Sequence, residues 1–167
     1  MLLGEIVHPG VIKLNLEAEN KYEAIEELVD LLVDAHEVPL SLRNHLVESV
    51  VEREKSMSTG MDHGVALPHA SSEKVDEIIG ALGVAPEGIP FETLDGQPAR
   101  LIILLIMPRR NFQGHVRTLA GIAHLLANPG FRESVINAPD VKTILRLIEN
   151  AEQKEGLFKE YGGRSGA

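Results

Sequence analysis

The chain of 167 residues contains no cysteine and no tryptophan, and aromatic residues make up only 4% of it. Without cysteine it cannot use a disulfide framework, a thiol nucleophile, a cysteine-ligated zinc or an iron–sulfur cluster. The scarcity of aromatic residues and the net charge of −9 disfavour nucleic-acid binding, which relies on base stacking and basic surfaces. We therefore expect no nucleic-acid partner.

A long apolar segment is missing as well. The longest apolar run, residues 101–107, has the length of a strand, whereas a membrane-spanning helix needs about 20 apolar residues. The first residues show no basic region followed by a long apolar stretch, so no secretory signal is predicted. Together with the lack of cysteine, these absences favour one globular, cytoplasmic domain that is not embedded in a membrane.

The spacing of apolar residues predicts four helices. They run from Asn20 to before Pro39, from Ser41 toward Arg53, from after His115 to Leu126, and onward from Asp140. Asn20 and Glu23 have the spacing of a capping box, and Ser41 and Asp140 are also N-cap candidates because their side chains can accept hydrogen bonds from the first helical turn.

Extended segments are predicted at residues 11–16, 78–85 and 100–107, the last apolar enough to be buried on both faces. Residues 86–98 are rich in glycine and proline and read as a turn-rich connection. The alternation of strands and helices predicts an α/β fold, a three-layer sandwich with a central mixed β-sheet flanked by helices. One domain is expected over residues 1–151, followed by a polar C-terminal tail at 152–167.

Charge is unevenly distributed along the chain. Residues 96–132 contain no acidic residue but include five arginines, at positions 100, 109, 110, 117 and 132. The planar guanidinium group suits oxyanions such as phosphate. An anion-facing surface is therefore slightly favoured over a merely solvated face.

The most informative segment is residues 53–70, which combines a basic start with three hydroxyl residues, two glycines and a histidine after a proline. Glycines allow backbone N–H groups to converge on an anion, and serine and threonine hydroxyls add further donors. Pro68 stiffens the backbone that presents His69. A neutral imidazole is a competent nucleophile near neutral pH, so this loop is compatible with a phosphohistidine intermediate.

The same residues carry a family resemblance. Several motifs, in order, resemble the fructose/mannitol-type IIA domains of the phosphoenolpyruvate-dependent phosphotransferase system (PTS), which include the nitrogen-regulatory members. The motifs are Arg53-Glu54, Ser58-Thr59-Gly60, the segment 64–69 that ends in Pro68-His69, the turn at 91–98, and Gly114-His115. The resemblance covers roughly residues 5–150 and marks 1–151 as a type-2 IIA phosphotransfer domain.

The resemblance implies roles for individual residues. His69 would accept the phosphoryl group from a phosphocarrier protein of the HPr type, and His115 would be a second active-site histidine. Arg53 would stabilise the phosphoryl charge, since that group brings nearly two negative charges. Ser58, Thr59 and Gly60 would supply phosphate-binding donors. No metal and no cofactor is implied.

Two further roles are implied by the resemblance but not distinguished. The phosphoryl group would pass to the IIB component of a sugar permease, or its presence would regulate a target protein. The absence of a IIB- or IIC-like segment slightly favours the regulatory form. Two alternatives from other classes stay open: a metal-dependent hydrolase using Asp62, His63, His69 and His115, and a non-catalytic interaction module.

Some positions depart from the family pattern. Met61 and Asp62 follow Gly60, and Asp62 adds an acid close to the expected phosphate position. His63 is interpreted as a solvent-facing loop residue. His124 lies nine residues after His115, half a turn away around a continuous helix, so the two are not expected to share a site.

Overall fold

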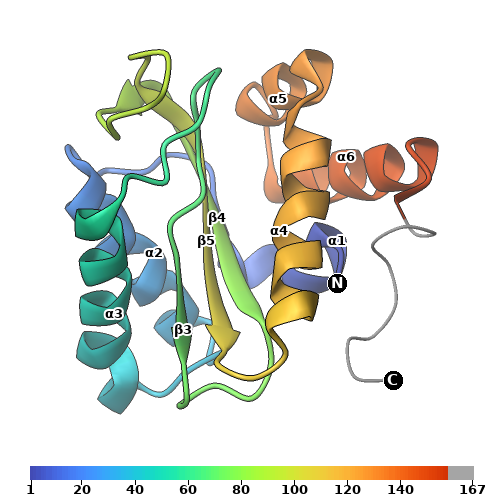
Figure 1. Ribbon diagram of the computed structural model, residues 1–167. Coiled ribbons are helices and arrows are strands. Elements are labelled where there is room, and N and C mark those ends of the chain that lie inside the picture. Colours follow the sequence, from blue (N-terminus) through green and yellow to red (C-terminus); the bar gives the residue numbers. More distant parts are fainter. Residues whose placement is uncertain (158–167) are drawn as a thin grey trace.

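The computed structural model describes residues 1–157, apart from the side chain of Phe112. Its central sheet lies between two layers of helices (Figure 1). The strands are β1 (Ile12–Lys13), β2 (Val65–Ala66), β3 (His69–Ser72), β4 (Ile79–Ile89) and β5 (Ala99–Pro108). The α-helices are α1 (Leu3–Ile6), α2 (Lys21–Asp34), α3 (Arg43–Ser56), α4 (Phe112–Leu126), α5 (Pro129–Ile136) and α6 (Val141–Lys154). Two short 3-10 helices, η1 (Pro9–Val11) and η2 (Leu40–Leu42), precede β1 and α3.

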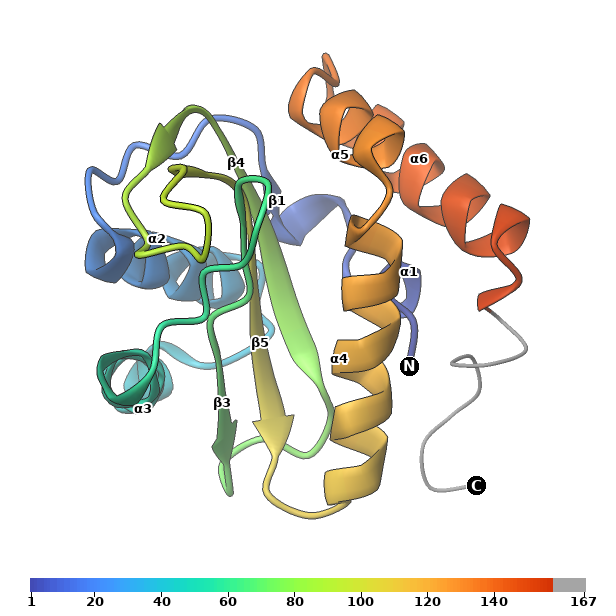
Figure 2. The same ribbon diagram turned by 45° about the horizontal axis from the view of Figure 1, so that its top comes forward.

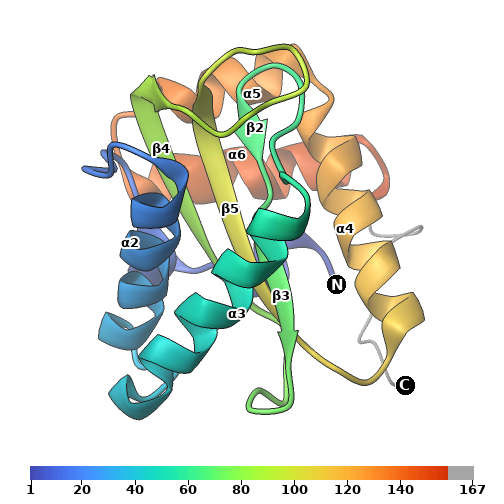
Figure 3. The ribbon, with the colours of Figure 1, turned by 60° about the vertical axis from the view of Figure 1, so that its left-hand side comes forward.

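The five-stranded sheet is mixed. Its order is β1-β4-β5-β2, and β3 also pairs with β5. Only the β4–β5 pair is antiparallel among the described strands, since β1, β2 and β3 each run parallel to their partner. Figure 3 shows β2 and β3 following one another along the same side of β5. The predicted three-layer α/β sandwich is confirmed.

The two outer layers differ in composition. Helices α2 and α3 cover one face of the sheet, and α1, α4, α5 and α6 lie on the other (Figures 1 and 2). Strand β5 is buried almost throughout, as its apolar sequence predicts. Strand β4 continues to Ile89 through an irregularity after Val84. Gly88 of the predicted connection therefore lies within a strand, whereas Gly96 lies outside it.

Two of the three predicted helix caps are confirmed. Asn20 accepts a hydrogen bond from the backbone N–H of Glu23, and Asp140 accepts one from Thr143. Ser41 is not a cap, because it lies within η2 and α3 begins after Leu42 without a side-chain cap.

Helices α1 and α5 are additions to the sequence prediction. The first is a single turn of four residues, too short for a periodic signal. The second is eight residues long and begins at Asn128-Pro129, where the Asn128 side chain accepts from the Phe131 N–H and proline occupies the first turn. Both are recognised helix-start signals.

The predicted domain boundary at residue 151 falls inside α6, which continues to Lys154. Glu152 is 3% exposed and Leu157 is 1% exposed, so the first residues of the predicted polar tail pack against the domain. The rest of that tail, residues 158–167, lies outside the described residues. Between residues 1 and 157, no helix combines the length and the apolar character that crossing a membrane would require.

Glu152 leads to a stability prediction. Its carboxylate accepts a hydrogen bond from the N–H of Gly4 at the start of α1, and burial raises its pKa to about 7. This pKa lies above the value of 4.5 for the same carboxyl group in the unfolded chain. The protonated form of Glu152 therefore stabilises the folded domain fully below about pH 4.5, and this contribution is lost as pH rises through about 7. Glu152→Gln should therefore raise the melting temperature at pH 8 and change it little at pH 5.

Thermal unfolding at the two pH values tests this expectation. Glu77→Gln, at an exposed position, is the control and should leave the melting temperature unchanged at both. A Glu152→Gln variant that is no more stable than the wild type at pH 8 would show that the ionised Glu152 does not destabilise the fold at that pH.

Candidate active site

His69 is the first residue of β3. It lies opposite Leu105 of β5 in parallel register, and the carbonyl of Pro68 accepts a hydrogen bond from the Leu105 N–H at 3.0 Å. The sequence pattern predicts residues 56–70 to be a loop with one short extended piece; the structure has two short strands here, β2 and β3, and His69 begins the second. The strand escapes detection from sequence because it is only four residues long and consists of small and polar residues.

The strand also determines which way the His69 side chain points. Ser72 of β3 is buried, and its Oγ lies 3.3 Å from Nε2 of His45 on α3. Ser72 therefore faces the α2–α3 layer. Because side chains alternate between the two faces of a strand, His69 faces the opposite layer, which contains α4.

The His69 ring is held by one short hydrogen bond. Nδ1 lies 2.7 Å from the carbonyl oxygen of Leu67, and because a carbonyl only accepts, Nδ1 must carry the proton. The neutral ring therefore keeps its lone pair on Nε2. Burial lowers the pKa of His69 below its usual value; the hydrogen bond to the Leu67 carbonyl opposes this effect in part, and the charge of Arg53 adds a smaller lowering. The structure thus favours a neutral imidazole at neutral pH.

Arg53 lies in the last turn of α3. One guanidinium nitrogen donates to the carbonyl oxygen of Met57 at 3.1 Å, while its own carbonyl accepts from Ser56 Oγ at 2.8 Å. These contacts place the guanidinium over the exit of the helix. Its positive charge contributes to the lowered pKa of His69.

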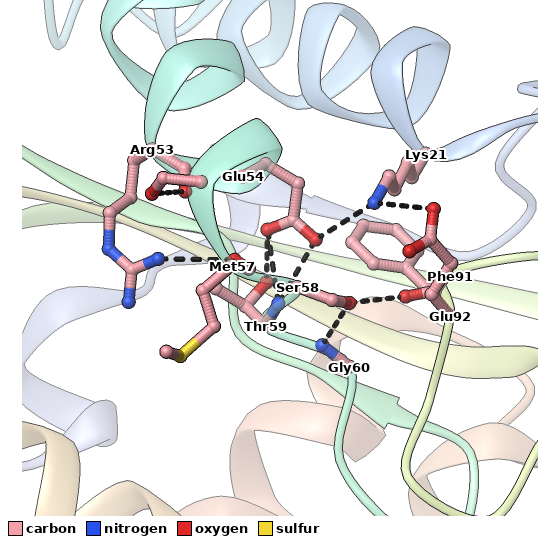
Figure 4. A network of polar contacts seen from close by, with 10 residues as sticks. Lys21, Arg53, Glu54, Met57, Ser58, Thr59, Gly60, Phe91 and Glu92 are labelled. Atoms are coloured by element: carbon pink, nitrogen blue, oxygen red, sulfur yellow. Dashed lines mark hydrogen bonds and ion pairs between the residues drawn. The ribbon is translucent and has the colours of Figure 1, made fainter.

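The residues that follow Arg53 are held by a buried carboxylate (Figure 4). Glu54 is 1% exposed and accepts hydrogen bonds from the Thr59 N–H at 3.0 Å and from Thr59 Oγ1 at 2.6 Å. The ammonium of Lys21, itself 6% exposed, lies 3.7 Å from Glu54 and 3.2 Å from Glu92. A buried charge requires such partners.

The three predicted phosphate-binding residues use their donors inside this network. Ser58 Oγ donates to the Phe91 carbonyl at 2.6 Å and accepts from the Gly60 N–H at 3.2 Å. Thr59 donates to Glu54 through both its N–H and its hydroxyl. These hydrogen bonds shape the loop, and the acceptors in them are other groups of the protein.

Lys21 and Glu54 are site residues to which the sequence pattern assigned no role. A signal for Glu54 exists, since it extends the buried positions Val47 and Val50 of α3 by one further helical turn. A glutamate at such a position is expected to be paired. Lys21 carries no comparable signal, because its two partners come from segments far apart in the sequence.

His115 lies in the first turn of α4, which begins shortly after β5 ends. It is 6% exposed, and burial lowers its pKa. Strand β5 pairs with β3, which begins with His69, and α4, which carries His115, is the next element after β5 in the chain. No hydrogen bond joins the two imidazoles in the part of the chain that the structure describes.

Asp62 and His63 lie in the loop that leads into β2. Asp62 and His63 are exposed, and the His63 N–H donates to Asp95 at 2.9 Å, which lowers the pKa of that carboxyl. Among residues 1–157, no three histidine, aspartate or glutamate side chains form a group that could hold a metal ion. The metal-dependent hydrolase alternative therefore finds no support.

His124 lies at the end of α4 opposite to His115 and pairs with Glu155.

Four of the five arginines of the acid-free window have separate partners: Arg100 contacts Glu133, Arg109 contacts Glu73, Arg110 contacts Asp76, and Arg132 donates to the Leu126 carbonyl. The expected anion-facing surface is thus divided among separate contacts for these four residues.

The family model described as "Phosphoenolpyruvate-dependent sugar phosphotransferase system, EIIA 2" matches residues 5–151. The chain belongs to this family. Its members act in PTS phosphotransfer or in regulation linked to it. The IIA domain is 31% identical over 138 residues to a "PTS system fructose-specific EIIA component" of Haloferax volcanii, an alignment covering 83% of this chain and 88% of the relative. It is 30% identical over 148 residues to a "Nitrogen regulatory protein" of Bradyrhizobium diazoefficiens, covering 89% and 95%.

A third relative is much longer than this IIA domain. The chain is 30% identical over 153 residues to the "PTS system fructose-specific EIIABC component" of Bacillus subtilis; the match covers 92% of the chain and 24% of that protein. Among solved structures, IIA-Ntr from Neisseria meningitidis superposes with a TM-score of 0.81 at 30% identity, covering 87% and 98%. IIA mannitol from Escherichia coli, at 23% identity and a TM-score of 0.72, covers 85% and 98% and shares the fold.

The buried ion pair between Lys21 and Glu54 leads to a prediction. Lys21→Met removes the cation beside Glu54 and leaves a buried carboxylate without its charge partner. Breaking such a pair costs about 3 kcal/mol of the free energy of unfolding, measured by urea denaturation. Lys74→Met, at an exposed position, should cost little. Equal stability of the two variants would show that Lys21 does not compensate Glu54.

Proposed function

We propose that this IIA domain carries a phosphoryl group on Nε2 of His69. The observation that carries the proposal is the hydrogen bond from Nδ1 to the Leu67 carbonyl, which leaves Nε2 as the nucleophile. In the transfer, the Nε2 lone pair forms a bond to phosphorus as the donor's phosphorus–nitrogen bond breaks. Alignment and charge stabilisation dominate such reactions.

The charge of the phosphoryl group must be balanced. Arg53 is the cation whose field reaches His69, and we assign it that role. His115 is proposed to donate to the phosphoryl oxygens from the first turn of α4. Ser58, Thr59 and Gly60 remain predicted phosphate-binding residues; their present hydrogen bonds support a contribution through the shape of the loop.

The proposed partners follow from the chemistry of a carried phosphoryl group. The donor is a phosphocarrier protein of the HPr type, and the receiver is a IIB component or, in a regulatory form, a target protein. IIA mannitol of Escherichia coli forms a complex with phosphorylated IIB mannitol. Met57 and Val116 are 68% and 48% exposed and adjoin Ser58 and His115 in the chain, and we propose that they contact the partner protein. The reaction is proposed to take place in the cytoplasm.

Phosphorylation by a phosphorylated carrier protein tests the proposal. The wild type should acquire an acid-labile, alkali-stable phosphate, and His69→Gln should acquire none. His124→Gln, the same change at a distant exposed histidine, should be phosphorylated normally. Retention of the phosphate in His69→Gln, or a failure of every phosphorylated carrier to modify the wild type, would refute the proposal.

His115→Ala should slow transfer without unfolding the domain. Loss of one preorganised donor to a developing anion costs about 100-fold in rate, measured in a single turnover by rapid quenching. The melting temperature should change far less than that of a core variant such as Ile102→Ala, whose side chain is fully buried. Normal transfer by a destabilised His115→Ala variant would contradict the assignment.

A further inference from the structure

Glu54 is the most deeply buried acid of the site, and the transfer chemistry does not use it. Its side chain is fully inaccessible, yet it receives two hydrogen bonds from the Thr59 N–H, at 3.0 and 3.2 Å, and one from the Thr59 hydroxyl at 2.6 Å. Burying a carboxylate is costly even with partners. An apolar residue would fill this position on α3 at lower cost, so the charge calls for another explanation.

The first consequence of the carboxylate is geometric. Glu54 holds Thr59, and the neighbouring Ser58 holds the Phe91 carbonyl, so that residues 57–60 are fixed between α3 and the segment that begins at Phe91 (Figure 4). A Cβ atom on Gly60 would come within 2.7 Å of the Phe91 carbonyl, which shows how closely the two segments approach. Met57, the acceptor for Arg53, lies at the start of this fixed segment.

The second consequence is electrostatic. Among residues 1–157, the charges that affect the pKa of His69 are those of Arg53 and Glu54, which are consecutive on α3. The Arg53 charge lowers the pKa of His69, and the Glu54 charge raises it. The two fields oppose each other at the ring. Arg53 alone would favour the neutral ring, but it would also make Nε2 a poorer electron-pair donor.

We infer that Glu54 is a positioning residue for phosphoryl transfer, which acts through Thr59 on the loop that orients Arg53 and through its charge on the His69 ring. This inference rests on the proposed transfer through His69. Lys21 belongs to the same device, because its ammonium, placed between Glu54 and Glu92, limits the repulsion between the carboxylate and an arriving phosphoryl dianion.

The electrostatic part is tested by following the His69 ring signals with pH in NMR spectra of the unphosphorylated protein. Glu54→Gln should lower the pKa of His69, and Arg53→Gln should raise it. Glu52→Gln, on an exposed position of the same helix, is the matched control and should leave the pKa unchanged. A folded Glu54→Gln variant whose His69 titrates as in the wild type would overturn the inference.

The geometric part is tested by single-turnover phosphorylation. Thr59→Val removes the hydroxyl donor to Glu54 and should slow transfer about tenfold, whereas Thr59→Ser keeps the donor and should restore the rate. If Glu54→Gln does not fold, this pair decides, and equal rates for the two Thr59 variants would contradict the inference. The titration needs no phosphoryl donor, so a wild type that is never phosphorylated refutes the proposed function while the His69 pKa still reports on Glu54.

Discussion

One hydrogen bond determines what this site can do. The Leu67 carbonyl holds the proton on Nδ1 of His69 at 2.7 Å, and it is in turn held by the backbone, since Pro68 stiffens the chain and its carbonyl pairs with Leu105. The backbone that carries the ring is thereby paired with β5, whose residues are buried almost throughout. In the proposed function, this hydrogen bond leaves Nε2 as the nitrogen that accepts the phosphoryl group.

Around this ring the protein distributes charge between two consecutive residues of α3. Arg53 remains partly accessible, where it can meet an incoming phosphoryl group, and Glu54 turns into the interior. The interior carboxylate is neutralised by Lys21 and by the donors of Thr59. The accessible Arg53 and the buried Glu54 thus lie in the same turn of α3. In our inference, the hydrogen bonds of Glu54 hold the loop that positions the Arg53 guanidinium.

The sequence predicted much of this architecture because its signals are local. The apolar run of β5 and the caps at Asn20 and Asp140 each depend on neighbouring residues. What it could not predict depends on distant partners. The β3 strand exists through its pairing with β5, and the hydroxyls of Ser58 and Thr59 donate to Phe91 and Glu54, partners that are not evident from the local sequence. The family resemblance supplied His69, Arg53 and His115 as candidates, and the contacts add the preferred nitrogen and the charged interior.

The position of the phosphoryl group on the ring tests the central claim most directly. Nitrogen-15 and phosphorus-31 NMR spectra of the phosphorylated protein identify the modified nitrogen of His69. The tautomer fixed by Leu67 requires the phosphoryl group on Nε2, with the Nδ1 proton still present. A phosphoryl group on Nδ1 would mean that the hydrogen bond breaks during transfer, and it would contradict the selection of Nε2 by the fold.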